Sequence, residues 1–185
     1  MKDFSLETGN PSIFKMRIQN QHIDYPKIAY GLIEVSQHCN IKYEYNAEFD
    51  LMEFDRKLSG SMRYPGNYGM IPNTLAEDGD PVDIIMLDEG AEIKPNTLVK
   101  LKTLGLLEMV DDGEIDYKIL CVSHNNQNFK SLEDVSQQEL SAIQDFFKNY
   151  KNLENKKVKI GLWKDLAFTH EYLINKYKNG GRGGS

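Results

Sequence analysis

The middle of the chain alternates short apolar and β-branched runs with polar turns, which is the pattern of β-strands. These runs cover residues 28–35, 41–45, 51–55, 98–110, 115–122 and 157–163. In the last run Val158, Ile160 and Leu162 alternate with polar or small residues, so we expect these three side chains to face the core. The dipeptide Asp112-Gly113 separates two of the runs and predicts a tight hairpin turn.

The last third of the chain changes to the helical period. Ser136 and Glu139 form a capping-box pattern that predicts the start of a helix. Its apolar stripe is Leu140, Ile143, Phe146, Phe147 and Tyr150. A second helix is predicted over 165–177, with one face formed by Leu166, His170, Leu173 and Tyr177. Short strands followed by two helices favour a mainly β fold, in which helices pack against a small barrel.

The length suits one domain, because 185 residues can bury a sizeable core. Residues 1–27 are polar and weakly patterned, and we interpret them as an N-terminal arm. The folded domain is expected over 28–178. The Gly-rich residues 179–185 are expected to be a disordered tail.

Charge and composition narrow the class of protein. The formal net charge of −6 argues against nucleic acid as a partner, because duplex-binding proteins carry a basic excess. No apolar run approaches the roughly 20 residues of a membrane helix, and the N-terminus shows no signal-peptide core. The two cysteines have neither CxxC nor zinc spacing, so we expect reduced, buried thiols and a cytoplasmic location.

The segment with the clearest chemistry is the acidic loop, residues 78–83. It places the carboxylates of Asp78, Asp80 and Asp83 within six residues, around a turn that Gly79 and Pro81 constrain. Like charges held this close repel, and a hard divalent cation with oxygen ligands is the usual remedy. A solvated acidic turn is the simpler interpretation, but the loop runs directly into an apolar strand-like segment, which favours a site.

A calcium-binding EF-hand is an alternative interpretation of the same loop. Asp78, Asp80 and Glu89 stand at loop positions one, three and twelve. The sixth position, however, is Asp83 instead of glycine, and a strand-like segment follows where a helix should begin. We therefore reject the EF-hand.

A second acidic group surrounds the predicted hairpin and comprises Asp111, Asp112, Glu114 and Asp116. Alone it would be a polar turn. Asp116 and Lys118 are two residues apart and share one face of a strand, as do Lys42 and Glu44. Each pair could be a surface ion pair worth about 0–1 kcal/mol. Together with two acidic turns, they indicate a site for metal ions and a polyanion.

These residues resemble a known family. The run Tyr64-Pro65-Gly66-Asn67-Tyr68-Gly69 followed by the acidic loop is similar to the signature region of Family I soluble inorganic pyrophosphatases of bacterial length. The supporting positions are Glu34, Lys42, Glu44, Asp55, Arg56, Asp111, Asp116, Lys118, Tyr150 and Lys151. The resemblance covers residues 28–177, and it implies a five-stranded OB-like closed barrel with two C-terminal flanking α-helices.

The resemblance also implies roles. Asp78, Asp83 and Asp116 would bind activating Mg²⁺, with Asp83 shared between two ions. Asp111 and Asp116 would hold metal that arrives with substrate, and Glu34 would act there through water. Asp80 would be the catalytic base. The phosphate oxygens would be contacted by Lys42, Arg56, Tyr68, Lys118, Tyr150 and Lys151. Glu44 would orient a lysine and water on the metal.

The expected activity is therefore hydrolysis of inorganic pyrophosphate to two orthophosphates by a metal-activated water. Several Mg²⁺ ions per site are implied, with Mn²⁺ as a substitute, and a homohexamer by family analogy. A non-catalytic OB-fold module for single-stranded nucleic acid is the alternative, but it needs a basic groove with stacking aromatic residues. A catalytically dead relative would have lost a matched residue, and none is lost.

Overall fold

The computed structural model describes residues 20–87, 91–151, 154 and 157–178. The predicted tail over 179–185 lies outside the described residues, as do residues 1–19 of the predicted arm. Across the described part, no helix is long and apolar enough to cross a membrane.

In the described residues strands precede the helices as predicted, except that Val158–Lys164 lies between the two helices; the strand Asn67–Ile71 was not predicted. The strands are β1 (Ile28–Val35), β2 (Ile41–Asn46), β3 (Leu51–Lys57), β4 (Asn67–Ile71), β5 (Val82–Leu87), β6 (Thr97–Asp111), β7 (Glu114–Ile115), β8 (Lys118–Ser123) and β9 (Val158–Lys164). The α-helices are α1 (Gln137–Asn149) and α2 (Leu166–Lys176), and a short 3₁₀ turn (Leu132–Asp134) precedes α1.

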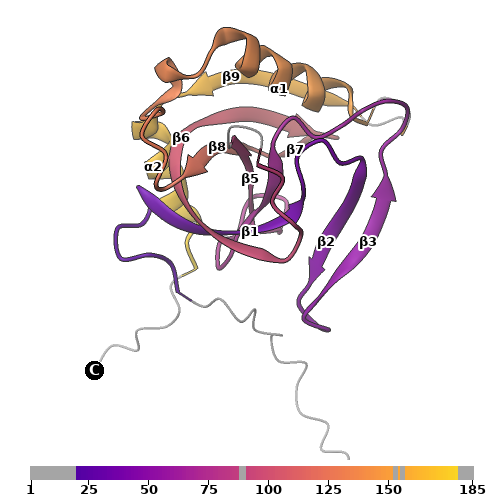
Figure 1. Cartoon of the computed structure of the whole chain (residues 1–185), viewed down its shortest axis with the longest axis horizontal. Helices are drawn as coiled ribbons and strands as arrows, with labels where there is room; N and C mark the ends of the chain where they lie inside the picture. Colours follow the sequence, from indigo (N-terminus) through magenta and orange to yellow (C-terminus); the bar gives the residue numbers. More distant parts are fainter. Residues whose placement is uncertain (1–19, 88–90, 152–153, 155–156, 179–185) are drawn as a thin grey trace, which may run out of the picture.

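Five of the strands close into a ring in the order β1-β4-β5-β8-β6, because β6 also pairs with β1. The β5–β8 pair is parallel, and the other four pairs are antiparallel. Figure 1 shows this ring, with β2 and β3 as a separate hairpin beside it and α1 with β9 along one side. The predicted mainly β fold, a five-stranded OB-like closed barrel with two C-terminal helices, is confirmed.

Both faces of the barrel strands are buried. Successive residues of β8 alternate between two apolar clusters, as Ile119 and Leu120 illustrate. The cluster that contains Leu120 includes Phe147 of α1, and the cluster that contains Ile119 includes Leu173 of α2. Each helix therefore covers apolar side chains that a sheet open to water would expose.

Gly69 permits a close approach between β4 and β1. A Cβ at this position would lie 2.0 Å from the carbonyl oxygen of Leu32 and 2.9 Å from Cα of Ile33. Only glycine lets the two backbones pair at this distance. The glycine that ends the signature run is thus required by the barrel itself.

The local turn and cap predictions are confirmed. Asp112 and Gly113 both have positive φ angles, 50° and 99°, between β6 and β7, as a two-residue hairpin turn requires. The Ser136 hydroxyl accepts from the backbone N–H of Glu139, and the Glu139 carboxylate accepts in return from the backbone N–H of Ser136. This capping box begins α1 as expected.

Three details differ from the sequence pattern. Leu162 was expected to face the core, but it is 69 % exposed. The β6–β9 register shifts between Leu107 and Met109. Leu107 therefore pairs with Trp163, whereas an unshifted register would pair it with Leu162. In α2 the buried residues are Thr169, Tyr172 and Leu173, a face rotated from the predicted one. Cys121 is buried as expected, but Cys39 is only half-buried.

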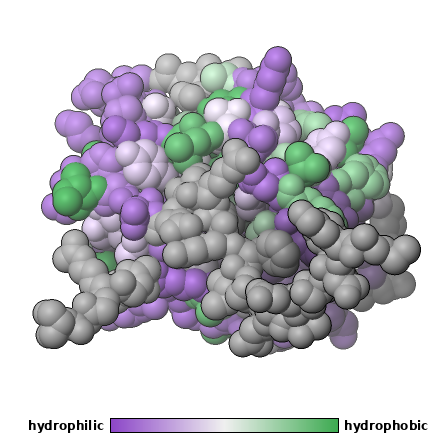
Figure 2. All heavy atoms as spheres, turned by 90° about the horizontal axis from the view of Figure 1, so that it is seen from below, coloured by the Kyte–Doolittle hydropathy of each residue, from purple (hydrophilic) through white to green (hydrophobic). Residues whose placement is uncertain are grey.

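The surface mixes charged residues with separate apolar groups. Figure 2 shows one face on which hydrophobic residues occur in several groups among hydrophilic ones. The largest exposed fractions of apolar side chains belong to Ile23, Phe49, Leu51, Phe54, Leu162 and Ile174. Such scattered exposure is normal for a folded domain.

Candidate active site

A cavity of about 640 Å³ opens at one end of the barrel, between the ring and the β2–β3 hairpin. It is lined by Glu34, Lys42, Glu44, Tyr45, Ala47, Arg56, Tyr68, Met70, Asp78, Asp80, Pro81, Asp83, Asp111, Asp112, Glu114, Asp116, Lys118, Tyr150 and Lys151. All thirteen residues to which the resemblance assigned a role are in this set. The fold therefore brings together side chains that are far apart in the chain.

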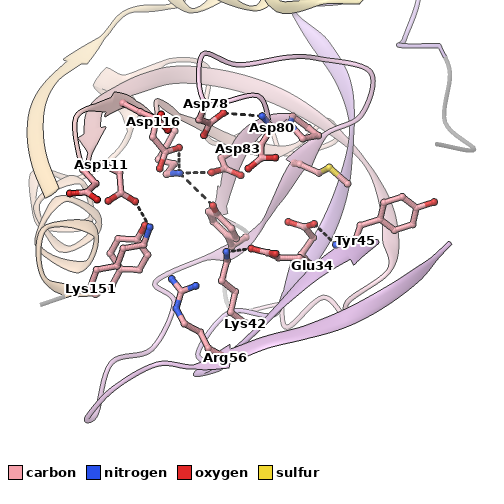
Figure 3. Close-up of a pocket in the computed structure, with 18 of the residues that line it drawn as sticks. Glu34, Lys42, Tyr45, Arg56, Asp78, Asp80, Asp83, Asp111, Asp116 and Lys151 are labelled. Carbon is pink, nitrogen blue, oxygen red and sulfur yellow. Dashed lines mark hydrogen bonds and ion pairs between the residues drawn. The ribbon is translucent and has the colours of Figure 1, made fainter. Parts of the chain in front are cut away.

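The carboxylates of the acidic loop face two cations of the hairpin across the cavity, whereas Lys118 and Lys151 lie among the carboxylates. In Figure 3 Asp78, Asp80, Asp83 and Asp116 lie on one side, and Lys42 and Arg56 approach from the hairpin on the other. Asp83 belongs to β5, whereas Asp78 and Asp80 precede that strand. Carboxylates that face cationic donors suit a ligand that carries both metal ions and negatively charged oxygens.

Lys118 lies between the carboxylates of Asp83 and Asp116 and contacts both. Its register partner in the parallel β5–β8 pair is Asp83, and its Nζ contacts carboxylate oxygens of Asp83 and, at 2.5 Å, Asp116. Lys118 is only 1 % exposed. Burial alone would lower the pKa of this ammonium, but the two carboxylates outweigh burial and raise it, so Lys118 stays charged.

The acidic wall nevertheless carries surplus negative charge. Burial, together with Asp83 and Asp78, raises the pKa of Asp116 to about 6, although Lys118 acts to lower it. Burial and the same two neighbours, Asp78 first, also raise the pKa of Asp80. One lysine does not offset this number of carboxylates, and a further cation would stabilise their ionised forms.

Glu34 lines the cavity and is 7 % exposed. One of its carboxylate oxygens accepts from the backbone N–H of Tyr45 at 2.9 Å, which links β1 to the hairpin. Burial first, and then the charge of Asp83, raise the pKa of Glu34 to about 8. A pKa of about 8 favours the protonated carboxyl group at neutral pH, and additional positive charge in the cavity would favour its ionised form.

The hairpin presents two of its cationic side chains, Lys42 and Arg56, as neighbours. Lys42 and Arg56 are register partners, and both contact the carboxylate of Asp55, at 3.1 Å and 2.6 Å. Lys42 also contacts Glu44 on the same face of β2, as the sequence predicted. Asp55 thus holds an ammonium and a guanidinium side by side at the cavity mouth.

The end of α1 supplies the third wall. Tyr150 is its C-terminal cap residue, and Lys151 follows it. The ring of Tyr150 packs on Phe146 and Phe147 with centroids 5.6 Å from each. Lys151 forms an ion pair with Asp111 at the end of β6. The aromatic stripe of α1 therefore fixes a phenol and an ammonium over the cavity.

Tyr64 was not assigned a role from the sequence, although it begins the signature run. It is 1 % exposed, and its ring packs 5.1 Å from that of Tyr68. Its hydroxyl is buried and has no hydrogen-bond partner in the described part of the chain. This buried hydroxyl without a partner, on a ring that packs against the cavity-lining Tyr68, adds Tyr64 to the candidate set.

The carboxylate oxygens that line the cavity are the ligands that hard divalent cations prefer. Among the described residues no three acidic, histidine or cysteine side chains are already gathered into a metal cage. Lys118 and Lys151 instead compensate the carboxylates. Asp111 keeps one buried oxygen atom without a partner in the described residues, so it retains a lone pair for a cation.

Comparison with known proteins agrees with this geometry. The sequence profile of the inorganic pyrophosphatase family matches residues 31–179. The chain is 40 % identical to an inorganic pyrophosphatase of Synechocystis over 139 residues, which cover 73 % of this chain and 81 % of the relative. It is 42 % identical to that of Ureaplasma parvum over 147 residues, 78 % of each chain.

Solved structures match in the same way. The crystal structure of inorganic pyrophosphatase from Thermus thermophilus superposes with a TM-score of 0.82 at 32 % identity, covering 86 % of this chain and 95 % of that one. The enzyme from Helicobacter pylori gives a TM-score of 0.78 at 35 % identity, covering 82 % and 92 %. Together with these matches, the closed barrel and its acidic cavity place the chain among the hydrolases that act on pyrophosphate. The chain belongs to the inorganic pyrophosphatase family.

Proposed function

We propose that the chain hydrolyses inorganic pyrophosphate to two orthophosphates with the help of Mg²⁺. The observation that carries this proposal is the cavity itself, which gathers a cluster of carboxylates together with lysine, arginine and tyrosine donors. In the reaction water adds to one phosphorus atom, the bridging P–O bond breaks, and each product leaves with one of the water's protons.

The Mg²⁺ ions would be held by Asp78, Asp83, Asp111 and Asp116, with Glu34 acting through water. When bound, they would neutralise substrate charge and lower the pKa of the attacking water. Mn²⁺ is the expected substitute, because it also prefers oxygen ligands.

The chain's own residues perform the remaining tasks. Asp80 has a raised pKa, owing to burial and to Asp78 and Asp83, which suits a group that accepts a proton. Arg56 offers a planar fork of donors, and Lys42, Lys118 and Lys151 offer point charges to the phosphate oxygens. Tyr68 and Tyr150 are buried, and burial raises their pKa, so they remain hydrogen-bond donors. Glu44 would orient Lys42, which it contacts.

Assembly and location follow from family resemblance. We propose a homohexamer in the cytoplasm, with residues 28–178 as its single folded domain. Sedimentation of the purified chain tests the hexamer, since a trimer or monomer at working concentration would contradict it.

Phosphate release from pyrophosphate at increasing Mg²⁺, and then with excess chelator, tests the reaction. Fast release that requires Mg²⁺ is expected. The absence of release from a folded sample at every Mg²⁺ and Mn²⁺ concentration would contradict the proposal, and binding of an oligonucleotide in its place would favour the non-catalytic alternative.

A further inference from the structure

The acidic loop has few hydrogen bonds of its own. The backbone N–H of Ala76 donates to the Asp80 carbonyl at 2.7 Å, that of Gly79 donates to the Ala76 carbonyl at 3.2 Å, and that of Asp80 donates to the Asp78 carboxylate at 3.0 Å. Gly79, with φ of 92°, allows the turn. These few local bonds leave open what holds the loop against the mutual repulsion of its carboxylates.

Glu77, directly before Asp78, connects the loop to α2. Its two carboxylate oxygens bind different partners on that helix: the Tyr172 hydroxyl donates to one at 2.9 Å, and the Lys176 ammonium lies 2.5 Å from the other. Tyr172 and Lys176 are one helical turn apart, and Lys176 Nζ lies 5.2 Å from the centroid of the Tyr172 ring. The Glu77 carboxylate is thus bound by two side chains of α2, one at each oxygen.

The helix that provides this grip is itself fixed to the barrel. Tyr172 is 8 % exposed, and its ring packs 5.3 Å from that of Tyr117. The carbonyl oxygen of Lys176 accepts from the backbone N–H of Leu75 at 2.9 Å, and Thr74 bridges to Tyr177. The segment that enters the acidic loop therefore runs along the end of α2.

We infer that Glu77, Tyr172 and Lys176 form a clamp that positions the acidic loop for metal binding from outside the cavity. This inference rests on the proposed function, in which Asp78 and Asp83 hold Mg²⁺. None of the three clamp residues lines the cavity. They are positioning residues, because they act through the backbone next to Asp78.

The variant Lys176→Met distinguishes a clamp from a long-range effect of charge, because the two predict opposite changes in Mg²⁺ affinity. Lys176→Met removes a positive charge close to the acidic loop, so long-range attraction alone would make Mg²⁺ bind more tightly. Loss of the clamp would make it bind more weakly. Tyr172→Phe removes only a hydroxyl and leaves the charge unchanged, so it isolates the positional effect.

The experiment measures Mg²⁺ binding to the purified full chain by calorimetry. Both variants should bind Mg²⁺ roughly 3- to 10-fold more weakly, at or below the lower end of the losses seen when partners that orient metal ligands are removed. At saturating Mg²⁺ they should turn over pyrophosphate at nearly the wild-type rate. Lys164→Met is the matched control: Lys164 pairs with Glu108 at 3.1 Å, so the same charge is lost without touching Glu77.

Hydrogen exchange in the metal-free protein gives a second readout. The backbone N–H groups of Gly79 and Asp80 should exchange faster in both clamp variants, while those of β8 should not change. Unchanged Mg²⁺ affinity with unchanged exchange would overturn the clamp, and so would tighter binding by Lys176→Met. If the wild type bound no Mg²⁺, the proposed function would fail, and exchange alone would still decide whether the clamp holds the loop.

Discussion

At the scale of single residues, Glu34 links the chemistry of the cavity to the stability of the fold. Its pKa rises from 4.5 to about 8 in the folded protein, chiefly through burial. Between these values the folded state keeps a proton that the unfolded state has lost. This contribution is therefore fully present below the unfolded pKa, and it is lost as pH rises toward 8.

We expect the Glu34→Gln variant to lack this loss of stability with rising pH, because glutamine does not titrate. At about 1.4 kcal/mol per pKa unit, the wild-type free energy of unfolding relative to the variant should fall by roughly 2–4 kcal/mol between pH 5 and pH 8. Urea denaturation in chelator at several pH values measures the difference. A constant difference between the two proteins would show that Glu34 ionises in the fold as it does in water.

Asp80 allows a sharper test of catalysis. Asp80→Asn keeps the size of the side chain but cannot accept a proton at neutral pH, so turnover should fall by at least about 100-fold while folding and Mg²⁺ binding persist. Asp112→Asn is the control, because Asp112 also lines the cavity and its φ of 50° is one that asparagine adopts readily. Equal rates for the two variants would remove Asp80 from the catalytic role.

At the scale of secondary-structure elements, the signature run is explained by strand pairing as well as by chemistry. In Gly69→Ala the new Cβ would meet the backbone of β1, which cannot move without breaking the ladder. We expect the free energy of unfolding to fall by about 3 kcal/mol or more, at the upper end of overpacking costs.

Gly31→Ala is the matched control for this substitution. There the Cβ would meet the ends of two flexible side chains, Leu101 Cδ2 at 2.7 Å and Ile84 Cδ1 at 2.8 Å. These methyl groups can rotate away, so the cost should be about 1 kcal/mol. Urea midpoints at constant slope measure both variants, and equal losses would mean that backbone contact is not what excludes a side chain at Gly69.

The same scale shows what the sequence could predict. Strands were found where local alternation or apolar runs decide the structure, as with β1, and α1 was found because its capping box is local. Long-range pairing was beyond the sequence. The parallel β5–β8 pair that sets Asp83 beside Lys118, and the register shift that exposes Leu162, depend on strands distant in the chain.

The candidate site was easier to predict than the pairing that builds it. Its carboxylates cluster in sequence, and Lys42 with Glu44 shares a face through the two-residue period alone. Tyr64 was not assigned because its orphan hydroxyl is a property of packing. The Glu77 clamp was equally hidden, since Tyr172 lies 95 residues away in the chain.

At the scale of the whole molecule, the cavity draws side chains from β1, the hairpin, the acidic loop, β5, β8 and the end of α1. Ligand binding there must therefore favour the closed barrel over any opened form. A ligand at 100 times its dissociation constant adds about 2.7 kcal/mol to the free energy of unfolding. Ligand binding in the cavity should therefore make opening of the barrel rarer. The labelling rate of a buried thiol in a barrel strand can measure this effect.

Cys121 is that thiol. It lies in β8 with 0 % exposure, its Sγ donates to the Ile85 carbonyl at 3.6 Å, and burial raises its pKa above the usual range. In a Cys39→Ser variant it is the sole cysteine, and a thiol reagent reaches it only after the β5–β8 pair separates. Its labelling rate should therefore give the same free energy as global unfolding measured with urea, and Mg²⁺ should slow it in proportion to site occupancy. Labelling much faster than global unfolding would mean instead that β8 opens locally while the remaining barrel stays folded.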